Sequence, residues 1–510
     1  MAGMNLLAVA MLLALAPAAA TAAATQPADP PPTVGQVAFA NAGAPEAQAP
    51  FLRGLALLHN FEYPAAAAAF REAQAADPGF AMAYWGEAMT YNHPVWMEQD
   101  RGAAQAALAR LGASPEARRA RAGSERERLY LDAVGILYGE GGKMERDRAY
   151  SQAMEALHRL YPDDVDARAF YALSLLGLAH HGRDVPLYMR AAALLEEVFP
   201  QYPDHPGVLH YLIHSYDDPT HAPLGLRAAR RYGAVAPEAA HALHMTSHIF
   251  LALGLWDDSV AANTASMATV NRHRAAAGLP ATGCGHAAEW LVYSDYQRGR
   301  TEAADAQVEL CRGDARAELD RPAEGPIEPG RSAVRSYADM AVRRLTETGH
   351  WVGAEGLDLP AGRYLSSRFT LAYGELLAAA GDPARVAAAH ARLRETAEAL
   401  RAARGPASPS AVTRREEIVL MQAAGLERLA GGDAEAGLAD LRAAAESERS
   451  IPAEFGPPLV EKPSFELLGD ALLRLGRGTE ARAAYEAALA LAPGRRLALD
   501  GLSGERRAAR

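Results

Sequence analysis

Histidines with helical spacing mark one stretch of the chain. Seven of the 16 histidines in the 510-residue sequence fall between His205 and His248. Within this stretch His210 and His214 are four residues apart, so they share one helical face. His244 and His248 repeat that spacing. Imidazole is a good ligand for Zn, Cu and other transition metals. The sequence therefore predicts a site at which imidazole nitrogens from two helices converge.

The two pairs are also in phase with each other. Each histidine of the second pair follows its counterpart by 34 residues, an interval typical of repeated helix hairpins. We predict one metal site, for Cu or Zn, made by His210, His214, His244 and His248, with His241, His286 and Glu289 at its margin. Asp217 and Asp218 could hold an imidazole tautomer from outside the coordination shell.

Two other interpretations of the histidines remain open. The same helix faces could line a groove for a peptide, protein or small organic ligand, without metal, and the histidines would then supply hydrogen bonds. The residues that the pattern places on this groove are His59, Trp85, His93, Tyr211 and Tyr293. The histidines could also serve only to satisfy neighbouring helices. The sequence leaves open whether the protein is an enzyme, because Tyr211 and Met245 stand where a zinc protease has its glutamate.

The elements that must position these residues are helix hairpins. Near the N-terminus Gly54 and Phe70 have the small-and-large pairing of two closely packed helices, and Gly469 and Tyr485 repeat it near the C-terminus. Apolar and polar residues do not alternate as in strands. These segments resemble the tetratricopeptide repeat, whose stacked hairpins bury a continuous core. The resemblance implies an all-α fold, a TPR-like α-α superhelix that is a solenoid of hairpins.

The chain as a whole resembles a group of exported bacterial tetratricopeptide proteins. The resemblance rests on the stretches AMAYWGEAM, ALHMTSHIF and EFGPP followed by KP, and it covers most of residues 51–500. It implies a repeat scaffold with a concave groove but no particular activity, because a repeat scaffold alone does not specify function.

Charge and the N-terminal residues bear on partners and location. A net charge of −11 argues against a nucleic-acid partner, which would need clustered Lys and Arg. Residues 1–24 have the apolar run and small residues of a signal peptide, so we expect a periplasmic or secreted protein. No integral membrane segment is expected once this peptide is removed. Residues 25–50 are rich in Pro and Ala and predict a flexible linker.

The remaining chain divides in the sequence into two helical parts. We expect an N-terminal array with the His-rich groove over 51–312, a Pro- and Gly-rich linker over 313–331, and a C-terminal helical block over 332–510. Cys284 and Cys311 are the only cysteines, and antiparallel helices would bring them to the same end of a hairpin. A disulfide is expected in an oxidising compartment. Two free thiols, or a thiolate ligand for the metal, are the alternatives.

Overall fold

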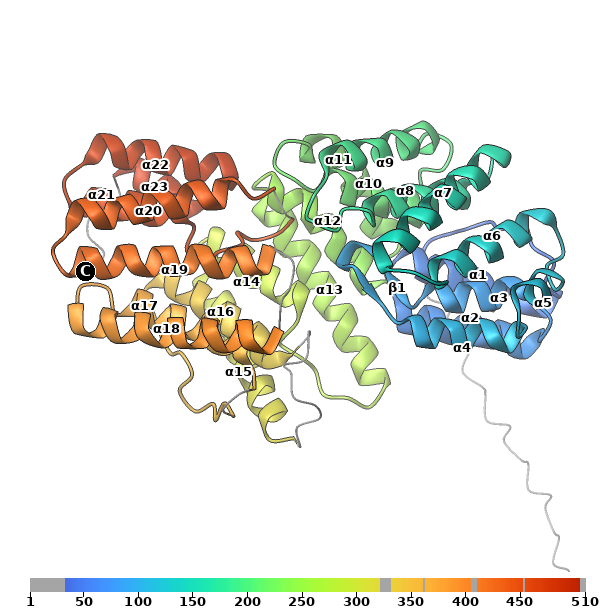
Figure 1. Ribbon diagram of the computed structural model, residues 1–510, viewed down its shortest axis with the longest axis horizontal. Coiled ribbons are helices and arrows are strands. Elements are labelled where there is room, and N and C mark those ends of the chain that lie inside the picture. The colour runs from blue at the N-terminus through green and yellow to red at the C-terminus, as the bar shows by residue number, and fades with distance from the viewer. Residues whose placement is uncertain (1–32, 322–331, 361–362, 405–410, 453–454, 505–510) are drawn as a thin grey trace, which may run out of the picture. The chain divides into compact units, whose positions relative to one another are not determined.

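Helices make up nearly all of the regular structure. The computed structural model describes residues 33–321, 332–360, 363–404, 411–452 and 455–504, and within these ranges the chain forms 23 α-helices, one short 3-10 helix and a two-stranded sheet (Figure 1). This confirms the predicted all-α fold class. Residues 1–24, assigned to the signal peptide, lie outside the described residues.

The first part of the chain contains α1 (Pro45–His59), α2 (Tyr63–Ala76), α3 (Ala81–Met89), α4 (Arg101–Leu111), α5 (Pro115–Arg119), α6 (Glu125–Leu137), α7 (Lys143–Leu160), α8 (Val165–Leu176), α9 (Val185–Val198), α10 (Pro206–Tyr216), α11 (Ala222–Val235), α12 (Ala240–Ala252) and α13 (Trp256–Ala276). The second contains α14 (His286–Gln297), α15 (Thr301–Leu319), α16 (Ala333–Thr348), α17 (Leu365–Ala378), α18 (Pro383–Arg404), α19 (Ala411–Ala430), α20 (Ala434–Arg449), α21 (Ser464–Arg474), α22 (Gly478–Leu491) and α23 (Arg496–Ser503).

Successive helices pair as hairpins, in which glycine allows the close approach that the sequence predicts. A Cβ added to Gly54 of α1 would lie 2.9 Å from the ring of Phe70 on α2. In the C-terminal hairpin of α21 and α22, a Cβ on Gly469 would lie 2.7 Å from the ring of Tyr485. Both contacts are too short for any other residue without a shift of the helices. The small residue is therefore needed because the large ring of the partner helix packs directly against its backbone.

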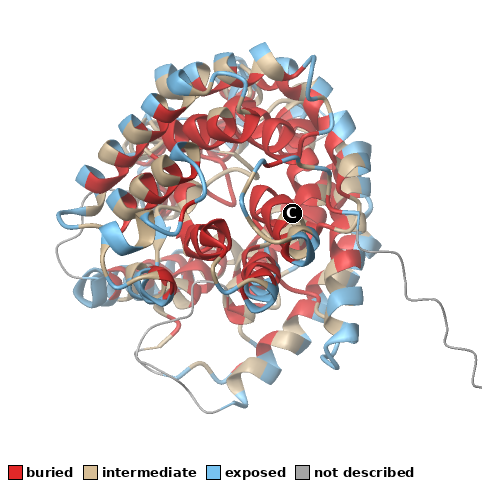
Figure 2. Ribbon diagram, turned by 90° about the vertical axis from the view of Figure 1, so that its right-hand side faces the viewer, coloured by how far each residue is buried: buried red, intermediate tan, exposed pale blue. Residues whose placement is uncertain are grey.

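The first helices of the central hairpins form an inner row. Helix α10 contacts α8, α12 and α1, and it also packs against its hairpin partner α11. All 11 residues of α10 are buried, whereas α9 and α11 bury only part of their surface. Figure 2 shows buried residues gathered on the inner helices and exposed residues on the outer ones. A helix that is apolar on all sides is stable only when it is buried on all sides, so polar side chains on this row need partners within the protein.

Two of the expected boundaries differ from the structure. The predicted linker over 25–50 includes residues that pack: α1 begins at Pro45, and Phe39 is 5% exposed with its ring stacked on Trp85. Several apolar side chains of this segment, Val34, Phe39 and Ala47, join the hydrophobic core and so hold it in place. The predicted linker over 313–331 begins inside α15, and the core that includes Met267 and Leu371 spans it in sequence. Residues 322–331 lie outside the described residues.

A small sheet interrupts the helices after α3. Strand β1 (Asn92–His93) pairs antiparallel with β2 (Glu98–Gln99) around a 3-10 helix, η1 (Pro94–Trp96). No strand is predicted here from the sequence, because a strand of two residues is too short to show alternation of apolar and polar residues. No helix among the described residues has the length and apolar character needed to cross a membrane.

Candidate metal centre

Neighbouring inner helices bring the predicted histidines together. His210 and His214 lie on α10, and His244 and His248 lie on α12, which packs directly against α10. None of these four side chains is more than 2% exposed. The 34-residue interval therefore does place the two pairs on adjacent helices at the same depth.

His210 and His214 form a first triad with His241 rather than a tetrad with α12's pair. One ring nitrogen from each of the three lies within 4.8 Å of the other two. The Nε2 atoms of all three histidines are buried, and none has a hydrogen-bond partner among the described residues. A buried nitrogen without a partner costs about 1–3 kcal/mol. Three such atoms in one place could share one ligand.

Hydrogen bonds on the other ring nitrogen fix the tautomers of His210 and His214. Nδ1 of His210 lies 2.6 Å from the carbonyl oxygen of His59, which can only accept, so Nδ1 carries the proton. Nδ1 of His214 donates to the Oδ2 atom of Asp217 at 3.2 Å. Nε2 of His210 and Nε2 of His214 therefore each present a lone pair. This is the arrangement of metal-ligating histidines, whose second nitrogen donates to a carbonyl or carboxylate.

Asp217 links the two histidine pairs. Its Oδ2 atom accepts from Nδ1 of His214 and also from Nδ1 of His248, at 2.9 Å. Its Oδ1 atom accepts from the guanidinium of Arg183 at 2.6 Å, and Arg183 also pairs with Asp218. Burial would raise the pKa of Asp217, but the hydrogen bonds from the two histidines and the charge of Arg183 hold it well below its usual range. The predicted role of Asp217 in orienting imidazoles agrees with these contacts.

His244, His248 and His286 form a second triad. One ring nitrogen of each lies within 4.8 Å of the others. Nε2 of His244 and Nε2 of His248 are 3.2 Å apart. His286, at the first turn of α14, is exposed, and its ring centroid lies 4.6 Å from that of His244. The indole of Trp290 stacks on His248 at 4.4 Å.

Burial favours the neutral form of four of these imidazoles. It lowers the pKa of His210, His241 and His244 well below the usual value, and the neighbouring histidines lower it further. For His248 burial lowers the pKa to about 3, although the hydrogen bond to Asp217 works in the opposite direction. Neutral imidazole is the form that binds metals.

His59, placed on the ligand groove by the sequence, belongs to a separate buried group. Its Nε2 lies 2.9 Å from Oδ1 of Asp166, and its Nδ1 lies 3.0 Å from the hydroxyl of Tyr211. His205 shares Asp166 at 3.3 Å. A Cβ on Gly207 would lie 2.3 Å from Nδ1 of His59, so only glycine lets α10 approach this ring. With both nitrogens of His59 engaged, the group has the character of a structural network joining α1, α8 and α10.

Several other predicted site residues lie away from the triads. Trp85 is 1% exposed and packs edge-on against Tyr130 and Phe170 in the core, so it does not line a groove. His93 lies in β1 and stacks on Tyr63, because α3 ends before it. These aromatic rings fill the space between helices, a use that position within a repeat does not distinguish from ligand contact.

Tyr293 and Glu289, on α14, also face elsewhere. Tyr293 is buried against Trp256 and the buried guanidinium of Arg495. Glu289 accepts a 2.6 Å hydrogen bond from the hydroxyl of Ser336 on α16. In this structure Glu289 is therefore not a member of either triad, contrary to its predicted place at the margin of the site.

Phe61 contacts all three histidines of the first triad, which no pattern in the sequence predicts. Its ring centroid lies 4.2 Å from that of His210, 5.9 Å from that of His214 and 5.6 Å from that of His241. The residue lies in the turn between α1 and α2 with a φ of 56°, which is uncommon for any residue but glycine. Backbone strain of this kind persists where the surroundings fix the residue.

Asn263 and Phe455 complete the surroundings of the second triad. The amide of Asn263 on α13 donates to the Ser259 carbonyl, which leaves its Oδ1 to accept from Nδ1 of His244 at 2.7 Å. Phe455, from the segment EFGPP, stacks on His248 with ring centroids 4.9 Å apart. Asparagine within a helix carries no sequence signal of this role.

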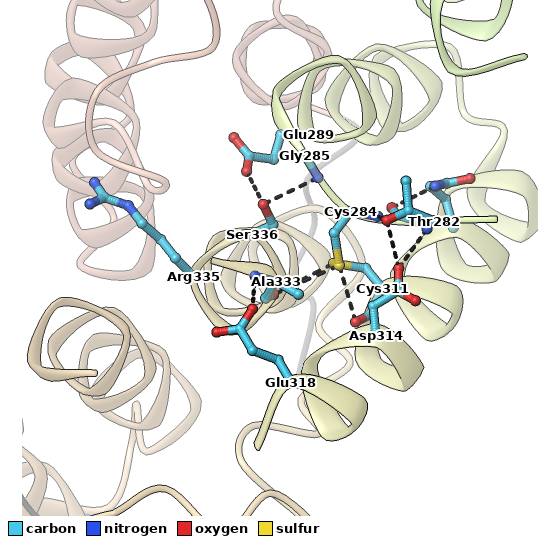
Figure 3. Close-up of a disulfide and its surroundings, with 12 residues drawn as sticks. Thr282, Cys284, Gly285, Glu289, Cys311, Asp314, Glu318, Ala333, Arg335 and Ser336 are labelled. Carbon is cyan, nitrogen blue, oxygen red and sulfur yellow. Dashed lines mark hydrogen bonds between the residues drawn. A yellow bond between two sulfur atoms is a disulfide. The ribbon is translucent and has the colours of Figure 1, made fainter. Parts of the chain in front are cut away.

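A disulfide joins α15 to the segment that precedes α14. The Cα atoms of Cys284 and Cys311 lie 4.7 Å apart, and the bond is buried (Figure 3). The amide of Gly283 and the hydroxyl of Thr282 donate to Asp314 of α15 at 2.7 and 2.9 Å. The bond excludes free thiols and a thiolate ligand. It also fixes the start of the helix that carries His286.

Comparison with known proteins gives only a loose similarity of fold. No protein-family model and no curated protein sequence matches the chain. Solved structures that are similar include the APC/C hetero-tetramer Cut9–Hcn1, with 11% identity over 92% of this chain and 78% of that chain and a TM-score of 0.38. Yeast Tom70 has 12% identity over 90% of this chain and 94% of that chain, with a TM-score of 0.33. The TPR domain of P58(IPK) has 12% identity over 90% and 97%, with a TM-score of 0.20. These scores carry no argument about activity or partners.

Proposed function

We propose that this protein binds a transition-metal ion through His210, His214 and His241. The observation that supports the proposal is the set of three buried Nε2 atoms without hydrogen-bond partners, each from a ring within ligand distance of the other two. Because Nδ1 of His210 and of His214 carries the proton, Nε2 of each ring has the lone pair that would bind the metal. Burial lowers the pKa of His210 and His241 well below the usual value, so these two rings would bind a metal without first losing a proton.

The donor set favours Zn or Cu. Three imidazoles are a known zinc set, with Zn–N distances of about 2.0–2.1 Å and a fourth position for water or another ligand. Cu²⁺ binds a given nitrogen site more tightly than Zn²⁺ does. The ion that the protein carries then depends on which metal is available, and the open position would admit a substrate if the protein is an enzyme.

Export is part of the same proposal. The buried disulfide between Cys284 and Cys311 supports it, because such bonds persist in oxidising compartments and are rare in the cytosol. N-terminal sequencing of protein from the periplasm or medium should find a mature chain that begins after residues 20–24. Material confined to the cytoplasm, with Met1 intact, would contradict export.

A metal titration followed by thermal unfolding tests the site. Zn²⁺ or Cu²⁺ added to chelator-treated protein should stabilise the wild type, by about 2.7 kcal/mol at one hundred times the dissociation constant. His210→Ala should show a smaller stabilisation than the wild type, whereas His350→Ala, at an exposed histidine that belongs to neither triad, should show the full effect.

An unchanged melting temperature in the wild type would overturn the proposal. An equal rise in His210→Ala and wild type would do the same. A peptide or organic ligand bound equally well before and after chelation would favour the metal-free groove instead.

A further inference from the structure

Two adjacent triads, rather than one set of four histidines, line α10, α12 and α14. We propose that the protein binds a pair of metal ions, one at His210, His214 and His241 and the other at His244, His248 and His286. This inference rests on the proposed function, which concerns the first triad alone. It adds a second ion and a coupling between the two.

The second triad has its own argument from hydrogen bonding. Nδ1 of His244 donates to the Oδ1 atom of Asn263, whose orientation is fixed by the bond from its amide to Ser259. Nδ1 of His248 donates to Asp217. Both Nε2 atoms are then acceptors, yet they face each other 3.2 Å apart. Two facing lone pairs repel unless a cation lies between or beside them.

The separation of these nitrogens suits one shared ion. Two ligands at about 2.0–2.1 Å from a tetrahedral metal lie roughly 3.3 Å apart, close to the 3.2 Å between Nε2 of His244 and Nε2 of His248. His286 supplies the third nitrogen, within 4.8 Å of the other two. A proton shared between the two rings is the competing explanation. It would leave the second triad without a metal ion after loading with Zn²⁺.

Asp217 makes the two ions a pair rather than two independent sites. One carboxylate oxygen accepts from His214 of the first triad and from His248 of the second. The ring centroids of these histidines are 5.4 Å apart. Orienting groups of this kind typically change metal affinity by about 10–100-fold when they are removed. Loss of Asp217 should therefore weaken both ions.

Each triad has one histidine that is more accessible than its partners, and this gives a matched pair of variants. His241 is half-buried and His286 is exposed. His241→Ala removes a ligand from the first triad and His286→Ala removes one from the second, and neither opens a large hole in the core. His350→Ala again serves as the control.

The experiment measures bound metal per chain by elemental analysis after loading with Zn²⁺ and dialysis. We expect two ions in the wild type and the control, one in each single variant and none in the double variant. With Cu²⁺, the electron paramagnetic resonance of the wild type should be broadened by a neighbouring spin. Either single variant should restore the spectrum of an isolated ion.

The outcomes separate the two proposals. No metal in the wild type would overturn both. If the wild type binds one ion, and only His241→Ala loses it, the proposed site at the first triad would stand and the proposal of two ions would be overturned. One ion lost in both single variants would show a single shared site and overturn the pair. Two ions that remain in His286→Ala would place the second ion elsewhere and also overturn it.

Discussion

The guanidinium of Arg183 donates to Asp217 at 2.6 Å, and both side chains are buried. The guanidinium helps to keep Asp217 ionised, so that the carboxylate can accept hydrogen bonds from both His214 and His248. Arg183 also pairs with Asp218 at 3.0 Å, so the cation has a second partner.

Asp217→Asn should weaken metal binding while the protein remains folded. The amide is neutral and has a single acceptor oxygen, so it orients His214 and His248 less firmly. Because groups that orient metal ligands contribute about 10–100-fold in affinity, we expect a loss of this size in competition with a chelator. Asp218→Asn is the matched control, since Asp218 contacts Arg183 and His221 but neither triad. Equal losses in the two variants would contradict the orienting role.

At position 61 a glycine variant should be more stable than an alanine variant, which is the reverse of the usual order of stability. Truncation of a buried Phe to Ala costs about 3–5 kcal/mol. Phe61 has a φ of 56°, at which any Cβ costs roughly 1–2 kcal/mol. Phe61→Gly should therefore be more stable to denaturant than Phe61→Ala by about that amount, although both lose the ring that packs on the first triad. An alanine variant as stable as the glycine variant would show that the turn relaxes.

Glu289 should make the protein less stable as the pH rises toward neutrality. Burial raises its pKa from 4.5 to about 7, and the charge of Asp339 adds to this, whereas Ser336, Arg343 and Arg335 oppose it. The folded state holds the proton more tightly than the unfolded state, so this stability is present below pH 4.5 and is lost as the pH passes 7.

A neutral substitution at this position removes the effect. Between pH 5 and 7.5 the melting temperature of Glu289→Gln should fall less than that of the wild type. Glu302→Gln, at an exposed position on α15, should behave as the wild type does. A parallel fall in all three proteins would rule out Glu289 as the source.

Removal of the disulfide should cost stability and the second ion. Cys284 and Cys311 are 27 residues apart, and a loop of this length corresponds to about 3.6 kcal/mol in the chain-entropy account. The variant in which both cysteines become serine should lose about that much unfolding free energy, measured with denaturant. It should also bind the second ion more weakly, because Cys284 lies two residues before His286. If the metal content at limiting Zn²⁺ is unchanged in this variant, the disulfide does not affect binding of the second ion.

The sequence predicts that the histidines form a site, but it does not predict that they separate into two triads. The interval of 34 residues is enough to place His210 and His214 beside α12's pair, since repeats stack in register. The division into two triads depends on ring orientation. Asp217 accepts from Nδ1 of both His214 and His248, which leaves Nε2 of His214 for the first triad and Nε2 of His248 for the second. No spacing in the sequence records such a choice.

The groove residues were harder to predict for a related reason. In an array whose inner helices are buried on all sides, an aromatic residue at a repeat position can face either a ligand or the next helix. Trp85 faces the next helices, with Tyr130 and Phe170 around it. The supporting residues Phe61 and Asn263 come from a turn and from an outer helix, where repeat spacing gives no information.

The position of the disulfide implies an order of events in the maturation of the protein, in which oxidation comes before full metal binding. The bond ties the residues just before α14 to α15, and His286 follows at once on the first turn. A newly made, reduced chain would hold five of the six histidines on helices that the bond does not touch, and the sixth on a loosely held helix start. We expect such a chain to take up one ion and the oxidised chain to take up two. Oxidation would then act as the step that commits the protein to its full metal content.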